Sequence, residues 1–349
     1  MERKRLRELG IGIGELEVGK YNSITDVEGV IVGHKTIIDK DVVSGVTIIM
    51  PNEGKLEGCH FPAGIFRFNG TGEFTGYHWI KETGTLVSPI IFTGSHLLGM
   101  AHRYLALATR KVNGLEPFSM GVVGETWDGW LSDIEKTTME YKDLEEAILS
   151  ARSGVIEEGN VGGGAGMIAF EFKGGIGTSS RMINCNGMEY TIGAIVQSNF
   201  GRRKDFMIEG KNIGSIISDQ EVPLPWTNNR NKGSLLVTIA TDAPLTASQC
   251  ERVSKRAALA MARVGDMGDE GSGDFFLTFS TGNKYSYDNE QLNNIRMLQI
   301  EELDKIFQGA IESVTEAILN SMTMAETIEG QNGRKVYELP LDKLKEIFD

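Results

Sequence analysis

Short apolar runs rich in β-branched residues alternate along the chain with longer segments whose apolar residues recur at helical spacing. The short runs are bounded by Gly, Asp and Ser, which commonly mark the ends of strands. Ile168, Phe170 and Phe172 alternate with smaller or polar neighbours and predict one more strand. The other strands are predicted within residues 29–38, 42–50, 88–94, 118–126, 190–200, 235–240 and 271–280.

Five segments have the period of an amphipathic helix. Ser95 and Thr246 are the expected N-caps of two of them, because a hydroxyl can accept from the free backbone N–H groups at a helix start. A hairpin is expected after residue 205, followed by a polar, turn-rich run from Thr227 to Gly233. The predicted helices lie within residues 95–114, 139–154, 244–265, 294–322 and 336–349.

Strands and helices intermix over the whole length, and the sequence has neither an internal repeat nor a clear linker. A chain of 349 residues is long for one domain but within the range of a single large α/β body. The pattern therefore predicts one α/β (α+β) domain, residues 1–349, built of packed layers.

The charge balance is acidic, with a formal net charge of −13. Nucleic-acid binding needs clustered Lys and Arg, so a nucleic-acid partner is not expected. The short basic stretches at residues 2–8 and 201–205 are interpreted as solvated surface. No apolar run is long enough to span a membrane, and no secretory signal is recognised, so a cytoplasmic protein is predicted.

The three cysteines are far apart, and the five histidines show no metal-ligand spacing, so neither a metal nor a cofactor is expected. Two glycine-rich stretches resemble phosphate-binding motifs but are incomplete. Residues 14–21 end in Tyr21 where a phosphate loop needs Ser or Thr, and residues 164–169 lead into a strand rather than a helix.

Ser234 lies at the junction between the polar run and a strand-like segment, directly after Gly233. The plain interpretation is a turn followed by the first residue of a strand. If the bond between the two residues were cut, Ser234 would carry a free α-amine with a pKa near ~7.7–8.0. That amine could take the proton of the Ser234 hydroxyl, so that one residue would supply both nucleophile and base.

The chain resembles the self-processing aminopeptidases that include L-aminopeptidase/D-esterase and the β-peptidyl aminopeptidases. The resemblance runs from about residue 5 to about residue 335. It rests on "GSLLVTIATDAPLTASQCERVSKRAALAMARVG" and "GSGDFFLTFSTGN", together with "YNSITDVEGVIVGH", "GETWDGWLSD", "EGNVGGGAGM", "FKGGIGTSSR" and "VQSNFGRR".

This resemblance implies a four-layer αββα sandwich that is similar to N-terminal-nucleophile hydrolases but differs in connectivity. It implies a precursor cut between Gly233 and Ser234 into residues 1–233 and 234–349. It also implies a metal-free enzyme and a homo-oligomer of the cleaved pair.

By the same resemblance, Ser234 falls on the nucleophile and Asn199 on the side-chain amide that helps to hold the oxyanion. Ser272 and Asp274 fall on a Ser-x-acid pair near the nucleophile, where some members carry Glu instead of Asp274. Each has a plain alternative as a turn residue. Thr178, Ser179 and Ser180 form a rival nucleophile cluster that ranks below Ser234.

Glu125 falls on the acid that meets the free amine of the substrate, and Asp128 is a neighbouring candidate. Trp127 stands where a Tyr is expected, so a hydroxyl donor is replaced by an indole. Packing in a core or an interface is the plain alternative for Trp127.

The sequence therefore predicts an aminopeptidase or amidase that removes N-terminal residues from short peptides, amides or esters through an acyl-enzyme on Ser234. Two alternatives remain open on the same fold. One is an acyltransferase or an amide hydrolase acting on pantetheine-like substrates, and the other is a non-catalytic protein that binds small molecules.

Overall fold

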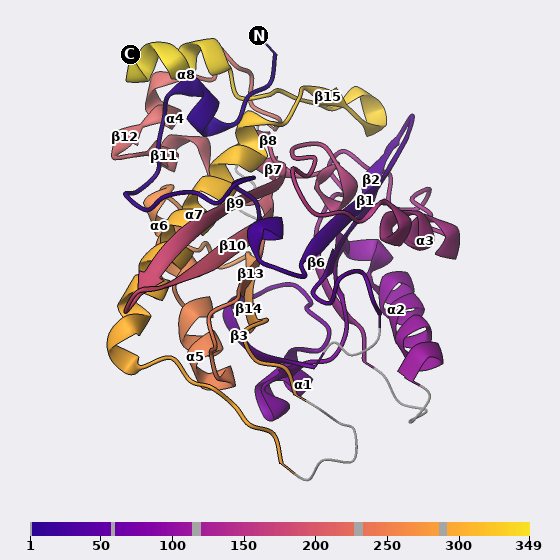
Figure 1. The fold of residues 1–349 in the computed structure, drawn as a ribbon. Coiled ribbons are helices and arrows are strands. Elements are labelled where there is room, and N and C mark those ends of the chain that lie inside the picture. The colour runs from indigo at the N-terminus through magenta and orange to yellow at the C-terminus, as the bar shows by residue number, and fades with distance from the viewer. Residues whose placement is uncertain (1, 57–59, 114–119, 227–232, 286–291) are drawn as a thin grey trace.

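Two β-sheets lie face to face, and helices cover the outer face of each (Figure 1). This arrangement comes from a computed structural model that describes residues 2–56, 60–113, 120–226, 233–285 and 292–349. The four layers, αββα, confirm the predicted fold class.

The smaller sheet has the strand order β1-β2-β5-β6. The pairs β1–β2 and β2–β5 are antiparallel, whereas the pair β5–β6 is parallel. The parallel pair needs a crossover, which the helix between these two strands supplies. The strands are β1 (Ile31–Asp39), β2 (Val42–Met50), β5 (Ile90–Gly94) and β6 (Val122–Thr126).

The larger sheet has the order β4-β3-β14-β13-β10-β9. Its two central strands, β13 and β14, are parallel, and all its other pairings are antiparallel. Every residue of β13 and β14 is buried, as expected for strands covered on both faces. The strands are β3 (Phe61–Gly70), β4 (Thr85–Leu86), β9 (Gly175–Cys185), β10 (Met188–Asn199), β13 (Ser234–Thr241) and β14 (Gly273–Ser280).

Three apolar cores separate the four layers. One fills the space between the two sheets and includes Phe92, Leu236 and Phe275. The second lies between the larger sheet and its helices, and the third lies between the smaller sheet and α2 and α3. The helices on the larger sheet are α5 (Ala247–Ser254), α6 (Ala257–Arg263) and α7 (Leu303–Thr323), and those on the smaller sheet are α2 (Leu98–Asn113) and α3 (Tyr141–Ser150).

Shorter elements lie at the ends of the layers. The remaining helices are α1 (Tyr77–Thr83), α4 (Ile213–Ile216) and α8 (Leu341–Phe348). The two-residue strands outside the two large sheets pair as three hairpins: β7 (Ile168–Ala169) with β8 (Phe172–Lys173), β11 (Met207–Ile208) with β12 (Lys211–Asn212), and β15 (Ile328–Glu329) with β16 (Lys335–Val336).

Three of the predicted helices differ from the structure. The segment 244–265 forms two helices, α5 and α6, rather than one, although Thr246 is the N-cap of α5, as expected. Ser95 is not a cap, because it is the first residue of a 3-10 turn, Ser95–Leu97, that follows Gly94. The helix expected from residue 294 begins only at Ile300, with a 3-10 turn that continues into α7.

The strand expected through Ile168, Phe170 and Phe172 is a tight hairpin instead. Phe170 and Glu171 have positive φ angles of 49° and 60°, which turn the chain between β7 and β8. The two phenylalanine rings are fully buried, so the alternating pattern reflected burial rather than an extended backbone. The hairpin predicted after residue 205 is present as β11 and β12, and most of the polar run, 227–232, lies outside the described residues.

The interpretation of the two basic stretches as solvated surface holds for their lysines, which are exposed, and is wrong for their arginines. The Arg5 guanidinium donates to the carbonyl oxygens of Tyr21 and Thr178 at 3.0 and 2.7 Å and pairs with the buried Glu158 at 2.7 Å. Arg203 is 3% exposed, and its guanidinium lies 3.9 Å from the centre of the Phe172 ring. Both arginines therefore bind peripheral chain segments to the body of the protein.

A buried ion-pair network joins β9 to α7. The side chain of Arg181 is fully buried and pairs with Glu316 at 2.7 Å and with Glu312 at 3.1 Å. Removing the arginine would leave two carboxylates buried without this cation. Breaking a buried pair in that way typically costs about 3–5 kcal/mol.

We therefore expect Arg181→Ala to lower the melting temperature by about 4–7 °C. The matched control is Arg263→Ala, which breaks an exposed 2.9 Å pair with Glu209 and costs at most about 1 kcal/mol. Thermal melting of the two variants side by side makes the comparison. Equal melting temperatures would contradict a stabilising role for the buried network.

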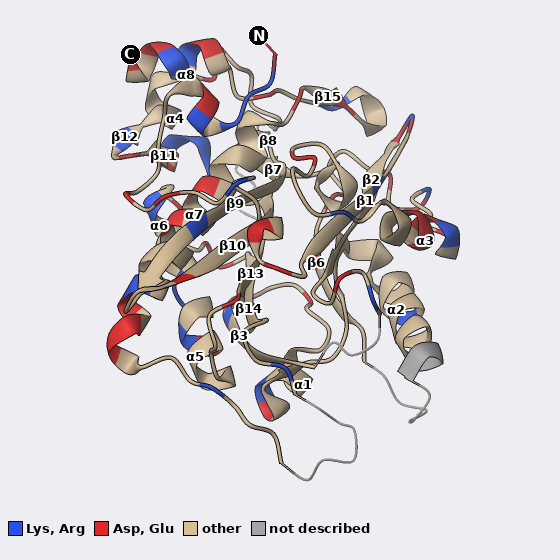
Figure 2. Cartoon of the chain, in the orientation of Figure 1, with Lys and Arg blue, Asp and Glu red and all other residues tan. Residues whose placement is uncertain are grey.

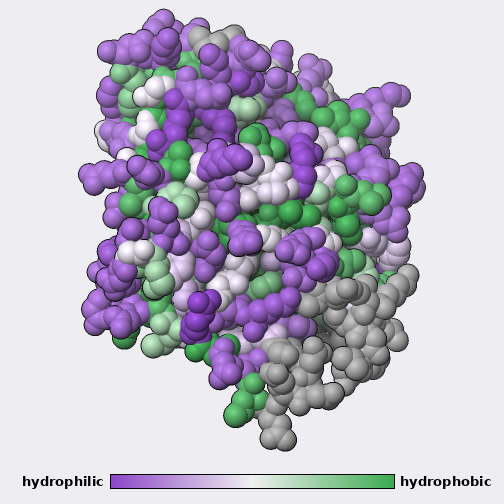
Figure 3. Space-filling view, viewed as in Figure 1, coloured by the Kyte–Doolittle hydropathy of each residue, from purple (hydrophilic) through white to green (hydrophobic). Residues whose placement is uncertain are grey.

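The surface is polar and mixed in charge. Both lysine and acidic side chains lie on α3 and on α8 (Figure 2). On the face shown in Figure 3, apolar residues appear as separate patches among hydrophilic ones. Within the described residues, no helix combines the length and the apolar character needed to cross a membrane.

Candidate active site

Ser234 is the first residue of β13, in the middle of the larger sheet. Because β10 and β14 pair with the two sides of β13, Ser234 lies opposite Asn199 on one side and Gly273 on the other. The residue is 6% exposed. Three segments distant in sequence therefore meet at one end of the sheet, and strand pairing fixes the backbone of Ser234.

Gly233 lies so close to β10 that a side chain would not fit. A β-carbon at this position would lie 2.6 Å from both the carbonyl oxygen of Asn199 and the Cα atom of Phe200. The carbonyl oxygen of Gly233 accepts from the backbone N–H of Gly273 at 3.1 Å and from the Ser234 hydroxyl at 2.7 Å. The Gly233 carbonyl is thus held in place and polarised next to that hydroxyl.

Asn199 is the last residue of β10, and its side-chain amide has a defined orientation. Its Oδ1 accepts from the backbone N–H of Ile168 at 2.9 Å, and its Nδ2 donates to the carbonyl oxygen of Trp127 at 3.1 Å. An amide has one acceptor end and one donor end, so these two bonds assign it without ambiguity. The nitrogen carries a second N–H that can serve another acceptor.

Asp274 follows Gly273 on β14 and is fully buried. Its Oδ1 accepts from the Ser272 hydroxyl at 2.8 Å and from the backbone N–H of Leu235 at 2.9 Å. Its Oδ2 accepts from the side chain of Asn69 at 2.9 Å. Burial raises the pKa of Asp274, while the bonds from Ser272 and Asn69 oppose that rise. The structure thus brings Ser272 and Asp274 together beside Ser234, because the residue between them, Gly273, pairs with Ser234.

Glu125 approaches the same end of the sheet from β6 of the smaller sheet. Its Oε1 accepts from the backbone N–H of Glu73 at 2.8 Å, and its Oε2 accepts from the Ser95 hydroxyl. A β-carbon on Gly72 would lie 3.1 Å from Glu125 Oε1 and 3.4 Å from the Cα atom of Gly273. Because Gly273 pairs with Ser234, only the width of a glycine separates the Glu125 carboxylate from the strand beside Ser234.

Trp127 and Asp128 follow β6 and differ in accessibility. The Trp127 residue is 38% exposed, while its carbonyl oxygen accepts from Asn199. Asp128 is 2% exposed, and its carboxylate accepts from the Ser44 hydroxyl. Burial raises the pKa of Asp128 to about 6. The structure thus leaves the indole of Trp127 open and packs Asp128 inside.

The model of peptidase family S58 matches residues 22–336 of this chain. The chain belongs to peptidase family S58. Beta-peptidyl aminopeptidase BapA of Sphingosinicella xenopeptidilytica is 38% identical over 370 residues, which cover 99% of this chain and 90% of that protein. Membership in S58 and this similarity make the chain a hydrolase of the aminopeptidase class, as the sequence predicted.

Two solved structures similar to this S58 chain support the fold. A Burkholderia sp. beta-aminopeptidase is 38% identical with a TM-score of 0.91, and the match covers 98% of each chain. The L-aminopeptidase D-Ala-esterase/amidase of Ochrobactrum anthropi is 36% identical with a TM-score of 0.91, and the match covers 99% of this chain and 98% of the other. The latter is described as a variant of the Ntn hydrolase fold, in agreement with the four layers of this S58 member.

The rival nucleophile cluster of this S58 chain lies inside the core. Thr178 donates to the carbonyl oxygen of Ala194, and the hydroxyls of Ser179 and Ser180 donate to Asn22 and Asp26. All three residues are at most 1% exposed. Their hydroxyls are thus engaged in packing contacts away from the end of β13.

Sequence reasoning missed two side chains of the S58 site. Asn69 holds Asp274 from β3, a strand that was not predicted because Pro, Gly and Arg interrupt its apolar pattern. Ser95 holds Glu125 and was interpreted as a helix cap. The short distance from Ser95 to the end of a predicted strand was a usable signal, whereas nothing in the sequence marked Asn69.

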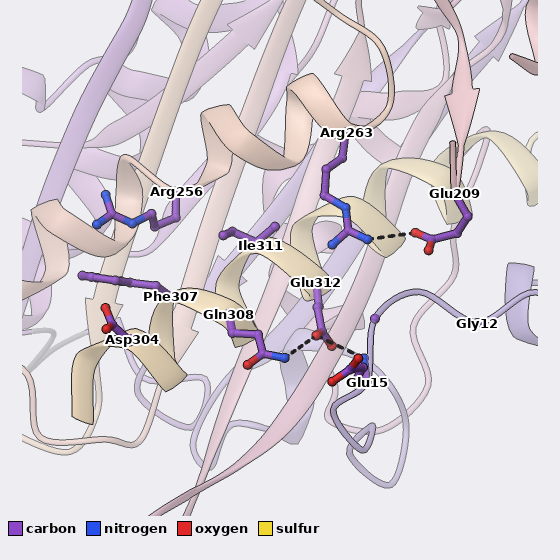
Figure 4. Close-up of a pocket in the computed structure, with 11 residues that line it drawn as sticks. Gly12, Glu15, Glu209, Arg256, Arg263, Asp304, Phe307, Gln308, Ile311 and Glu312 are labelled. Carbon is purple, nitrogen blue, oxygen red and sulfur yellow. Dashed lines mark hydrogen bonds and ion pairs between the residues drawn. The ribbon is translucent and has the colours of Figure 1, made fainter. Parts of the chain in front are cut away.

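A groove of this S58 chain lies apart from the candidate site. It has a volume of about 710 Å³ and lies in the helical layer, where Arg256, Arg263 and Phe307 line it (Figure 4). No candidate catalytic residue belongs to its wall. Within the described part of the chain, no three His, Cys, Asp or Glu side chains gather as a group that could hold a metal ion.

Proposed function

We propose that this protein is a serine aminopeptidase that cuts its own chain between Gly233 and Ser234 and then uses Ser234 as the nucleophile. One observation carries the proposal. The Ser234 hydroxyl lies 2.7 Å from the carbonyl oxygen of Gly233, and the Gly273 N–H donates to the same oxygen. A nucleophile and a donor for the developing negative charge thus lie next to one peptide bond.

In the self-cleavage step, the Ser234 oxygen attacks the carbonyl carbon of Gly233. A C–O ester bond forms, the peptide C–N bond breaks, and the hydroxyl proton is transferred to the released amine. Water then hydrolyses the ester, which leaves a carboxylate on Gly233 and a free hydroxyl and α-amine on Ser234. Only a glycine fits the close contact of residue 233 with β10. Because Gly233 has no side chain, its carbonyl carbon is open to attack by the Ser234 oxygen.

In turnover, the α-amine of Ser234 takes the hydroxyl proton as the oxygen attacks a substrate carbonyl. Asn199 donates its second N–H to the oxyanion, a contribution worth about 2.7–4 kcal/mol for one donor of this kind. Ser272 and Asp274 orient the new terminus. The buried carboxylate of Asp274 suits that position, because it attracts an ammonium group through charge-assisted hydrogen bonds.

Glu125 binds the ammonium group of the substrate, with Trp127 beside the incoming residue and Asp128 supporting the loop from inside. The substrates are short peptides, amides or esters, and β-residues are among the accepted N-terminal residues. Similarity to the beta-peptidyl aminopeptidase BapA and to the Burkholderia sp. beta-aminopeptidase supports the last point. Comparison of a β-alanyl and an L-alanyl anilide tests it.

We expect Glu125→Gln to raise KM for substrates with a free amine by about 10–100-fold, because a hydrogen bond to a charged group contributes about 1.5–3 kcal/mol. The variant keeps the size of the side chain and removes its charge. The control is Glu135→Gln, an exposed acid outside the site. Steady-state kinetics on an L-alanyl anilide measures the effect, and an unchanged KM would remove Glu125 from the amine site.

The experiment that tests the proposal as a whole is the intact mass of the purified protein under denaturing conditions. We expect two species that correspond to residues 1–233 and 234–349, with Ser234 as the second N-terminus. A single species of 38.2 kDa that hydrolyses aminoacyl anilides would rule out the terminal amine as base. We further propose a cytoplasmic homo-oligomer of the cleaved pair, which size-exclusion chromatography with light scattering tests.

A further inference from the structure

The hairpin formed by β15 and β16, near the C-terminus, lies against the loop that follows β6. Residues 330–334 connect its two strands, and the backbone of this turn is closed by a 2.9 Å bond from the Gly330 N–H to the Arg334 carbonyl oxygen. The loop after β6, residues 127–132, is about 200 positions earlier in the sequence. The contact between them is therefore a tertiary one.

Gln331 makes most of this contact. Its side-chain Nε2 donates to the carbonyl oxygens of Gly129 and Ser132, each at 2.8 Å, and lies 3.5 Å from that of Trp130. Its backbone N–H donates to the carbonyl oxygen of Leu131 at 2.8 Å. One residue thus reaches four consecutive carbonyl groups of the loop. Loops rarely satisfy such groups by themselves, so this contact fixes the loop backbone.

Arg334 and Gly330 reinforce the same contact. The Arg334 guanidinium lies 4.3 Å from the centre of the Trp130 ring and donates to the carbonyl oxygen of Trp130 at 3.1 Å. A β-carbon on Gly330 would lie 2.1 Å from the carbonyl oxygen of Leu131, so the two backbones touch directly. The hairpin has no room to shift without moving the loop.

The loop leads directly to the candidate site. It begins at Trp127, two residues after Glu125, and the carbonyl oxygen of Trp127 accepts from Asn199. The backbone N–H groups of Leu131 and Ser132 donate to the carbonyl oxygen of Asp128 at 3.1 and 3.0 Å. A displacement of residues 129–132 would therefore be transmitted to Trp127, the half-exposed side chain of the site.

We propose that Gln331 is a positioning residue that sets substrate affinity through this loop. The proposal rests on the proposed role of Glu125 and Trp127 in binding substrate. The hairpin contacts residues 129–132, in the loop that follows Glu125 and Trp127, whereas Ser234 is held by β10 and β14. Asn199 keeps its bond from the Ile168 N–H when the loop shifts, so loss of Gln331 weakens binding more than it slows the chemical step. A misplacement of about 1 Å can cost up to about 100-fold in catalytic efficiency.

The test is a KM-against-kcat comparison of Gln331→Ala with Glu329→Ala, an exposed residue on the same hairpin. We expect KM for an L-alanyl anilide to rise about tenfold in Gln331→Ala, with kcat within about twofold, and Glu329→Ala to match the native protein. Arg334→Met, which keeps an apolar side chain near Trp130 and loses the donor, should shift KM in the same direction.

Unchanged KM values in both Gln331→Ala and Arg334→Met would overturn the proposal. A tenfold fall in kcat with KM unchanged would overturn it as well. Melting temperatures show whether Gln331→Ala is folded. If it is not, the KM of Arg334→Met decides whether the hairpin sets substrate affinity. The intact mass of each variant separates this proposal from the proposed function. An uncut, inactive native chain would refute the proposed function, and the test of Gln331 would then be the affinity for the free-amine ligand L-alaninamide, measured by calorimetry on the same variants.

Discussion

In the Ser234→Ala variant we expect a single uncut chain of 38.2 kDa and a loss of hydrolysis on the order of 10⁶-fold. The substitution removes the hydroxyl that would attack the Gly233 carbonyl, and it removes the nucleophile of turnover as well. Folding should be unaffected, because the strand pairing of residue 234 uses only backbone atoms. Intact mass and anilide hydrolysis measure the two effects on the same preparation.

The control for this variant is Ser248→Ala, which removes an exposed hydroxyl on α5. It should be processed and active like the native protein. A cleaved Ser234→Ala protein would show that cleavage does not depend on this hydroxyl. An uncut native protein with full activity would keep Ser234 as nucleophile but would require another base.

For Asn199→Ala we expect kcat to fall about 10²–10³-fold while KM changes little. The lost N–H would act on the charge that develops in the transition state, so its removal affects the chemical step more than binding. The matched control is Asn184→Ala, an exposed Asn at the far end of the β9–β10 pair. A rise in KM of about 10²–10³-fold with no change in kcat would assign Asn199 to substrate binding instead.

Elements with strong local signals were predictable from the sequence. The strand at Ser234 is a short, mostly apolar run, and α5 begins with a hydroxyl cap at Thr246 followed three residues later by Gln249. β3 was missed, because it is interrupted by Pro62, Gly64 and Arg67, although its first five residues are buried. Burial by distant layers, not local preference, keeps that strand extended.

The site was predictable only in part, and for a physical reason. Resemblance to a family pointed to Ser234, Asn199 and Asp274, but the distance between them follows from the register of three strands that no local pattern encodes. Asn69 and Gln331 act through tertiary contacts with segments about 200 residues away. The basic N-terminal stretch misled for the same reason, since the partners of Arg5 include Thr178 on β9 and the buried Glu158.

The position of β13 has a consequence for the lifetime of the molecule. The proposed cut would release a chain end in the centre of a six-stranded sheet, between β10 of one piece and β14 of the other. The pieces would stay together through shared strands and cores, yet the short tether that favours their pairing during folding would be gone. The cleaved protein would therefore refold poorly after the two pieces separate, because their reassembly is a bimolecular event. Its lifetime would then be set by its unfolding rate, that is, by kinetic stability.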